Sequence, residues 1–195
     1  MKVKICGITN QEDAFLCEDK GADALGFIHC PGRARSLPLK TIAGICSSIG
    51  PMTTRILVCF PKDAPEAAQM CERSQADMLQ VYTLGPNELR KVASSGIGVI
   101  RAVKPDIKEV RLYSRIARAI LFEQGAPGTG ETYDYSKIPI RSCPRAIIAG
   151  GLDIQNLEQA KALKPYGLDV SSGVEKTPGR KDPGLVEEFV RRCKS

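Results

Sequence analysis

The sequence contains no run of about 18 apolar residues, the length that a membrane-spanning helix needs. Its first ten residues, MKVKICGITN, also lack the apolar stretch of a secretory signal peptide. Both absences lead us to expect a cytoplasmic protein with no membrane partner.

Signatures of metal sites and disulfide frameworks are missing as well. Histidine occurs once, at position 29, and no two of the eight cysteines form a CxxC pair. This spacing is typical neither of a zinc site nor of a disulfide scaffold. We therefore expect no bound metal, and we expect most of the cysteines to be reduced, small apolar residues of the interior.

Nucleic-acid-binding signatures are absent despite a formal net charge of +6. The basic residues are spread along the chain, aromatic residues make up only 5%, and no RRM-type or zinc-finger motif occurs. A positive charge suits an anionic metabolite equally well. We therefore predict a small-molecule partner and no nucleic acid.

What the sequence does contain is a regular alternation of short apolar runs and helix-like segments. The predicted strands are 2–8, 24–30, 54–60, 77–82, 98–104, 118–124, 145–151 and 168–175. The predicted helices are 10–22, 37–50, 63–76, 85–96, 106–117, 153–167 and 182–194, with Asp63 as an N-cap. A glycine-rich loop, 125–135, with room for one helical turn, follows the sixth strand instead.

These eight units predict an α/β fold, a single-domain (β/α)8 TIM barrel that spans residues 1–195. Short apolar strands are typical of a parallel sheet that helices cover. The alternative is a doubly wound open sheet, which usually has fewer strands and often a GxGxxG turn after the first. Here that turn reads CGITN and holds one glycine, so the barrel is favoured.

In such barrels the active site lies at the C-terminal ends of the strands. Two glycine-rich turns follow the last two predicted strands, AGG at 149–151 and SSGVE at 171–175. Backbone N–H groups in such turns can approach phosphate oxygens closely. The predicted phosphate-binding residues are Gly150, Gly151, Ser171, Ser172 and Gly173. The alternative is that both turns are merely tight connections.

Cys6 and Glu123 end the first and sixth predicted strands, at the same rim of the barrel. A thiolate and a carboxylic acid there would form a base and acid pair for proton transfer. The role of base requires a depressed pKa for the Cys6 thiol, which nearby cationic groups can supply. On spacing alone, a packed thiol and a solvated carboxylate remain the alternative.

Other polar residues follow the second and eighth strands. Arg33 and Arg35 stand in the segment PGRARS, where a guanidinium can hold a carboxylate or phosphate, or can simply be solvated. His29 either lines the pocket or is a satisfied residue at a strand end. Asp169 holds a substrate hydroxyl, orients the phosphate turn or caps that turn.

With these residues in view, the chain resembles the phosphoribosylanthranilate isomerase family over its whole length. Four segments carry the resemblance: KICGIT at 4–9, GADALGFI at 21–28 followed by RARS, PGTGETYDY at 127–135, and the long run from IIAGG to GRKD at 147–182.

The resemblance implies an Amadori rearrangement of N-(5′-phosphoribosyl)anthranilate to 1-(2-carboxyphenylamino)-1-deoxyribulose 5-phosphate in tryptophan biosynthesis, with no metal or organic cofactor. It implies that Cys6 is the general base and Glu123 the general acid. It also implies that Arg35 binds the substrate carboxylate. We expect Gln80, which the family pattern keeps, and Asp169 to bind substrate. We expect a monomer or a homodimer.

Three positions depart from the family pattern. Glu123 stands in place of an aspartate, Tyr82 in place of the histidine of a Gln-Leu-His-Gly pattern, and His29 in place of a phenylalanine. We expect all three to surround the pocket. They keep two other functions open, a different sugar-phosphate isomerase or epimerase on the same barrel and a non-catalytic phosphate-ligand binder.

Overall fold

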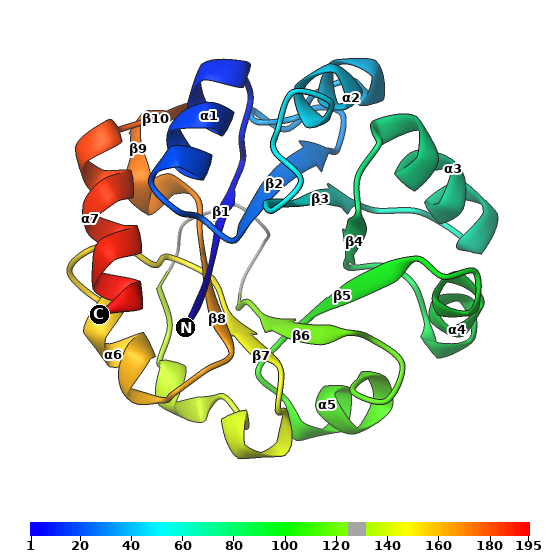
Figure 1. The fold of residues 1–195 in the computed structure, drawn as a ribbon. Coiled ribbons are helices and arrows are strands. Elements are labelled where there is room, and N and C mark those ends of the chain that lie inside the picture. Colours follow the sequence, from blue (N-terminus) through cyan, green and yellow to red (C-terminus); the bar gives the residue numbers. More distant parts are fainter. Residues whose placement is uncertain (125–131) are drawn as a thin grey trace.

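Eight parallel strands close into a barrel in the computed structural model of the protein, which describes residues 1–124 and 132–195 (Figure 1). Each strand pairs with the next in the chain, and β8 closes on β1. The (β/α)8 prediction is therefore confirmed. The strands are β1 Lys2–Cys6, β2 Ala24–His29, β3 Thr54–Cys59, β4 Met78–Val81, β5 Gly98–Val103, β6 Ala119–Phe122, β7 Ala146–Ile148 and β8 Gly167–Val170.

The α-helices surround the barrel on its outside (Figure 1). They are α1 Gln11–Asp19, α2 Leu39–Cys46, α3 Ala64–Ser74, α4 Pro86–Ser94, α5 Ile107–Tyr113, α6 Leu157–Ala162 and α7 Pro183–Lys194. The predicted N-cap is confirmed, since the Asp63 carboxylate accepts a hydrogen bond from the backbone N–H of Glu66. None of the helices among the described residues is long and apolar enough to cross a membrane.

The connection from β6 to β7 contains no α-helix in its described parts, residues 123–124 and 132–145. It holds two short 3-10 turns, η1 Tyr135–Lys137 and η2 Ile140–Ser142. Most of the predicted glycine-rich loop, residues 125–131, lies outside the described residues.

Side-chain alternation along the strands divides the interior into two parts. Leu25 and Phe27 of β2 belong to the larger cluster, which the barrel forms with the helices. Ile56, Leu121 and Ile147 belong to a smaller cluster whose members come from the other face of their strands, inside the barrel. Side chains on one face of a strand recur every second residue. A residue two positions after an inward-facing one therefore also faces the interior, nearer to the C-terminal ends of the strands.

A two-stranded hairpin after β8 was not predicted. A 3-10 turn, η3 Ser172–Val174, leads into β9 Glu175–Thr177, which pairs antiparallel with β10 Arg180–Lys181. Gly179 in the connecting turn has φ +80°, a left-handed conformation that favours glycine. The hairpin carries Lys181 back toward the end of β1.

The cysteines are all free thiols. Seven of them are buried, and Cys30 is half-buried. The prediction that most of them are reduced residues of the interior is confirmed.

Candidate active site

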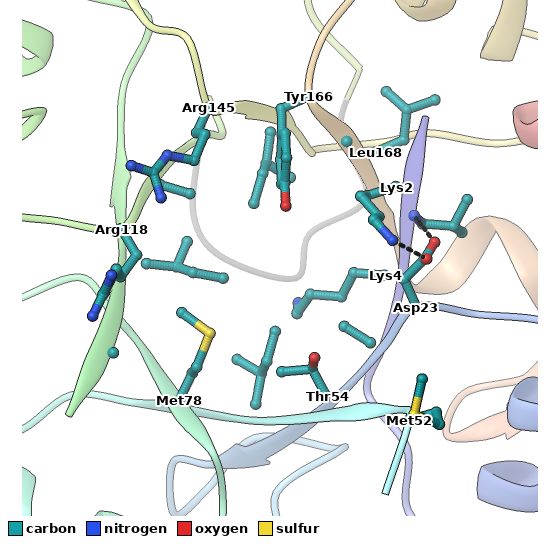
Figure 2. A pocket seen from close by; sticks show the side chains of 18 residues that line it. Lys2, Lys4, Asp23, Met52, Thr54, Met78, Arg118, Arg145, Tyr166 and Leu168 are labelled. Atoms are coloured by element: carbon teal, nitrogen blue, oxygen red, sulfur yellow. Dashed lines mark hydrogen bonds and ion pairs between the residues drawn. The ribbon is translucent and has the colours of Figure 1, made fainter. Parts of the chain in front are cut away.

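Cavities open at both ends of the barrel, and none of the predicted site residues lines the larger one. It has a volume of about 500 Å³ and opens at the N-terminal ends of the strands (Figure 2). Met78 and Ile147 form part of its apolar lining, and the ion pair of Lys2 with Asp23 stands at one side.

The cavity at the C-terminal ends of the strands has a volume of about 200 Å³. It brings together all the predicted site residues except Gly173. Those that line it are Cys6, Arg35, Gln80, Glu123, Gly150, Gly151, Asp169, Ser171 and Ser172. Segments from both ends of the sequence therefore meet at one site, as the barrel topology requires.

Cys6 ends β1 with its side chain directed into this cavity. Gly7 follows with φ +76°, and a Cβ there would lie 2.7 Å from Cδ of Arg35 and 2.8 Å from Oγ of Ser171. The glycine after the cysteine is thus required both by the backbone conformation and by close packing.

A buried ammonium group lies beside the Cys6 thiol. Lys4 precedes Cys6 on the same face of β1, and its Nζ donates to Oδ1 and Oδ2 of Asp169 at 2.9 and 2.8 Å. Although burial acts against it, the Asp169 carboxylate and the Cys6 thiol raise the pKa of Lys4. Lys4 is therefore a fixed cation below the floor of the cavity.

Burial raises the pKa of the Cys6 thiol above its ordinary value, while the charges of Lys4 and Lys181 oppose that rise. The depressed thiol pKa that the role of base requires is therefore not found. The cations that we expected near the thiol are present, and they limit the effect of burial without reversing it.

Gly26 of β2 makes room for this group of side chains. A Cβ at position 26 would lie 2.8 Å from Sγ of Cys6 and 3.0 Å from Nζ of Lys4. Sequence reasoning identified neither Lys4 nor Gly26. The available signals were a lysine in the middle of the first strand, between apolar residues, and a glycine within the second strand.

The carboxylate of Glu123 is held by a chain of hydrogen bonds from β4. The Tyr82 hydroxyl donates to Oε2 of Glu123 at 2.8 Å, and Nε2 of Gln80 donates to the Tyr82 oxygen at 3.0 Å. Phe60 stacks on the Tyr82 ring, with ring centres 4.9 Å apart. Oε1 of Gln80 is buried and has no hydrogen-bond partner among the described residues.

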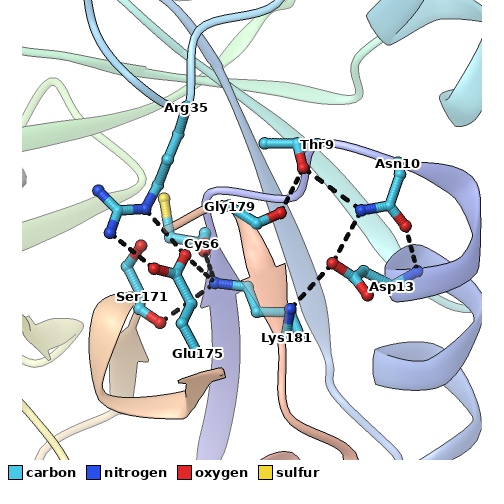
Figure 3. A network of polar contacts seen from close by, with 9 residues as sticks. All are labelled: Cys6, Thr9, Asn10, Asp13, Arg35, Ser171, Glu175, Gly179 and Lys181. Carbon is cyan, nitrogen blue, oxygen red and sulfur yellow. Dashed lines mark hydrogen bonds and ion pairs between the residues drawn. The ribbon is translucent and has the colours of Figure 1, made fainter. Parts of the chain in front are cut away.

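Arg35 is paired with a residue that sequence reasoning did not single out (Figure 3). Its Nε and Nη2 donate to Oε1 and Oε2 of Glu175 at 2.8 and 2.6 Å. Although burial acts against it, Arg35 and Lys181 lower the pKa of Glu175. Glu175 is therefore a buried carboxylate that fixes the plane of the Arg35 guanidinium.

Lys181 joins the same network from the hairpin (Figure 3). Its fully buried Nζ donates to the Cys6 carbonyl oxygen at 2.7 Å, to the Ser171 carbonyl oxygen at 3.1 Å and to Oε1 of Glu175 at 3.0 Å. The hairpin thereby ties the end of β8 to the end of β1.

The two glycine-rich turns lie against each other at the cavity. Gly150 and Gly151 have φ of +90° and +64°, and a Cβ on Gly173 would lie 1.9 Å from the Leu152 carbonyl oxygen. Gly173 is therefore the contact between the turns rather than part of the cavity lining. Among the described residues, the backbone N–H groups of Gly150, Gly151 and Ser172 donate no hydrogen bond.

The expectation that His29 surrounds the pocket is wrong. Its Nδ1 lies 2.8 Å from the Leu37 carbonyl oxygen, and its side chain does not line the cavity. The reason is strand alternation, because His29 shares a face of β2 with Leu25 and Phe27. Tyr82 and Glu123, the other two departures from the family pattern, do line the cavity.

The fold and this cavity define a (β/α)8-barrel protein with a thiol, a carboxyl group and two glycine-rich turns gathered at the catalytic end of the barrel. A family model described as N-(5′-phosphoribosyl)anthranilate (PRA) isomerase matches residues 3–192, and the chain belongs to that family.

Individual relatives agree with this assignment. The chain is 38% identical over 205 residues to N-(5′-phosphoribosyl)anthranilate isomerase of Methanothrix thermoacetophila, covering 100% of this chain and 98% of the relative. The crystal structure of phosphoribosyl anthranilate isomerase from Thermus thermophilus matches with a TM-score of 0.89 and 33% identity, covering 100% and 98% of the two chains.

A third match is a phosphoribosyl anthranilate isomerase crystallised in complex with reduced 1-(o-carboxyphenylamino)-1-deoxyribulose 5-phosphate. Its TM-score is 0.88 and its identity 29%, and the match covers 100% of this chain and 98% of that one.

Proposed function

We propose that the protein isomerises N-(5′-phosphoribosyl)anthranilate to 1-(2-carboxyphenylamino)-1-deoxyribulose 5-phosphate, an Amadori rearrangement in tryptophan biosynthesis. The observation that carries the proposal is that Cys6 and Glu123 line one cavity at the C-terminal end of the barrel. Residues 1–195 act as one catalytic domain in this proposal.

The reaction needs one acid and one base. Glu123 gives a proton to the furanose ring oxygen, the bond between C1′ and that oxygen breaks, and a Schiff base forms between C1′ and the anthranilate nitrogen. Cys6, as thiolate, then takes the proton from C2′, and the electron pair forms the double bond of an enolamine. The enolamine tautomerises to the ketose product.

Lys4 gives the thiolate its electrostatic support. A cation in a poorly solvated site stabilises a neighbouring anion far more than it would in water. Because Nζ of Lys4 is held by both oxygens of Asp169, it stays in place when the thiol ionises. Lys4 therefore favours the ionised form of Cys6 against the effect of burial.

Gln80 and Asp169 bind the ribose hydroxyl groups in this proposal. Oε1 of Gln80 is a buried acceptor with no partner among the described residues, so a substrate hydroxyl would satisfy it. Asp169 accepts from Lys4 at both oxygens, but each carboxylate oxygen has a second lone pair for a substrate hydroxyl.

The phosphate group binds between the two glycine-rich turns. The backbone N–H groups of Gly150, Gly151 and Ser172 supply the hydrogen bonds, with Ser171 beside them on the cavity wall. Gly173 holds the two turns together, because only a residue without Cβ can approach Leu152 so closely.

Arg35 binds the anthranilate carboxylate. Glu175 occupies Nε and Nη2 of the guanidinium, and Arg35 lines the cavity, so its remaining N–H groups are the donors for the substrate. Replacing Arg35 by alanine should weaken binding of a product analogue by roughly 1.5–3 kcal/mol, the value of a hydrogen bond to a charged group.

The measurement for Arg35→Ala is a pair of titrations, one with the reduced product analogue and one with an analogue that lacks the ring carboxylate. The second analogue should bind the variant and the unaltered protein almost equally. Equal losses of affinity for both ligands would assign Arg35 to a different part of the substrate.

Turnover of N-(5′-phosphoribosyl)anthranilate, followed by the loss of substrate fluorescence, tests the function itself. We expect turnover without added metal or organic cofactor. Binding of the reduced product analogue without turnover would instead indicate a non-catalytic phosphate-ligand binder. Turnover of a different sugar phosphate alone would indicate a related isomerase or epimerase.

We also propose a cellular location, a partner and an oligomeric state for the protein. Eight free thiols suit a reducing compartment, so we place the protein in the cytosol. Its partner is a small phosphorylated molecule rather than a nucleic acid or a membrane, and it acts as a monomer or a homodimer.

A further inference from the structure

We propose that Tyr82 is a positioning residue for Glu123, whose longer side chain it holds at the reacting end of the cavity. The inference rests on the proposed function, in which Glu123 is the general acid. It concerns two residues that both depart from the family pattern and that one hydrogen bond joins.

The two residues belong to strands that are not neighbours. Tyr82 follows β4 and Glu123 follows β6, with β5 between them. Ala102 is a buried, inward-facing residue of β5 in the cluster against which Tyr82 packs, and its register partner on β6 is Leu121, two residues before Glu123. Because the Ala102 side chain is only a methyl group, the Tyr82 ring can extend across β5 to reach the carboxylate.

Two neighbouring side chains, Phe60 and Gln80, fix the position of Tyr82. Phe60 stacks almost parallel to the ring, with an angle of 13° between the planes, and so restricts the ring's rotation. Nε2 of Gln80 donates to the hydroxyl oxygen, so the hydroxyl proton is directed toward Glu123 rather than toward Gln80. Burial and the Glu123 carboxylate raise the pKa of Tyr82 well above its ordinary value, so the hydroxyl stays protonated.

The length of the glutamate is what makes this contact possible. Aspartate is one methylene shorter, so its carboxyl group would withdraw from the Tyr82 hydroxyl by about 1.5 Å, one carbon–carbon bond. The contact at 2.8 Å would then be lost. We therefore expect the effects on kcat of substituting Tyr82 and Glu123 to be non-additive, as is usual for residues in direct contact.

A double-mutant cycle tests this dependence with the variants Tyr82→Phe, Glu123→Asp and the combination of both. Phenylalanine keeps the stack on Phe60 and removes only the hydroxyl. We expect Tyr82→Phe to lower kcat by about 10- to 100-fold, because misplacing a catalytic group by 1 Å can cost that much. In the Glu123→Asp background the same change should lower kcat by less than about twofold, since the contact is already lost.

Binding of the reduced product analogue separates positioning from substrate contact. Its Kd should stay the same in Tyr82→Phe, so that kcat falls while binding is retained. The matched control is Tyr113→Phe, which removes a buried hydroxyl that accepts from Arg101 on the outer side of β5. That variant should keep the activity of the unaltered protein.

Three results would overturn the inference. An equal loss of kcat in both backgrounds would mean that Tyr82 acts independently of Glu123, and a loss of analogue affinity would mean that Tyr82 binds the substrate. Full activity of Tyr82→Phe would also refute the inference. If Glu123→Gln is inactive in the same assay, the acid role of Glu123, and with it the proposed function, still stands. Normal turnover of Glu123→Gln would instead refute the acid assignment in the proposed function.

Discussion

Replacing Cys6 by serine is expected to remove most of the turnover and to leave ligand binding nearly unchanged. Serine has almost the same shape, but its hydroxyl is a far weaker base than a thiol at neutral pH. We expect kcat to fall on the order of 10²–10⁴, the range for loss of a positioned acid or base. Stopped-flow fluorescence of the substrate gives kcat, and titration with the reduced product analogue gives the affinity.

The pH dependence of the same variant is equally informative. Burial raises the pKa of the Cys6 thiol, so the thiolate fraction grows as the pH rises toward that value. The rate of the unaltered protein should therefore fall on the acid side as the thiol takes up its proton. The Cys6→Ser variant should lack this acid limb.

Cys30→Ser is the matched control for Cys6→Ser. Cys30 lines the same cavity but takes no part in the hydrogen bonds between Lys4 and Asp169, so its replacement should leave both kcat and the pH profile unchanged. A Cys6→Ser variant that keeps most of its kcat would place the base elsewhere.

Replacing Glu123 by glutamine is expected to lower kcat by a factor on the order of 10²–10⁴, since the amide cannot give up a proton to the ring oxygen. The amide keeps the length of the side chain and can still accept from the Tyr82 hydroxyl, so the local structure should survive. The reduced product analogue is already ring-opened and needs no proton, so its affinity should be unchanged.

The matched control for Glu123→Gln is Glu109→Gln, a half-buried carboxylate of α5 that lines the adjoining cavity. It removes the same charge at a nearby place and should leave kcat unchanged. Comparable losses in both variants would indicate a general electrostatic effect, and normal turnover of Glu123→Gln would make Asp134 or a bound water the candidate acid.

The barrel could be predicted from the sequence because each strand is a short apolar run and all of these runs except the sixth are followed by a helical segment. The same alternation of strands and helices predicted that Cys6, Gln80, Glu123 and Asp169 lie in one cavity. All four are inward-facing residues at the C-terminal ends of strands. The position of His29 was predicted wrongly because the alternation of side-chain faces along β2 was not applied to it. His29 is two residues after Phe27 and therefore shares its outward-facing side.

The supporting residues could not be found in the same way. Lys4 and Asp169 are 165 positions apart and become opposite neighbours only when β8 closes on β1. The hairpin with Glu175 and Lys181 has strands of three and two residues with polar side chains, too short and too polar for a periodicity signal. Closure of the chain, rather than local pattern, brings these groups to the cavity.

The distribution of the thiols determines where oxidants and electrophiles attack this protein. Burial raises the pKa of Cys17, Cys46 and Cys59 to about 12, so almost none of these thiols is ionised at neutral pH. Reagents that react only with a thiolate are therefore expected to leave these three cysteines unmodified. Cys30 alone is half-buried, and it stands on the wall of the cavity. We therefore expect chemical modification to begin at the cavity wall, and we expect a ligand bound there to shield Cys30, the most accessible thiol of the chain.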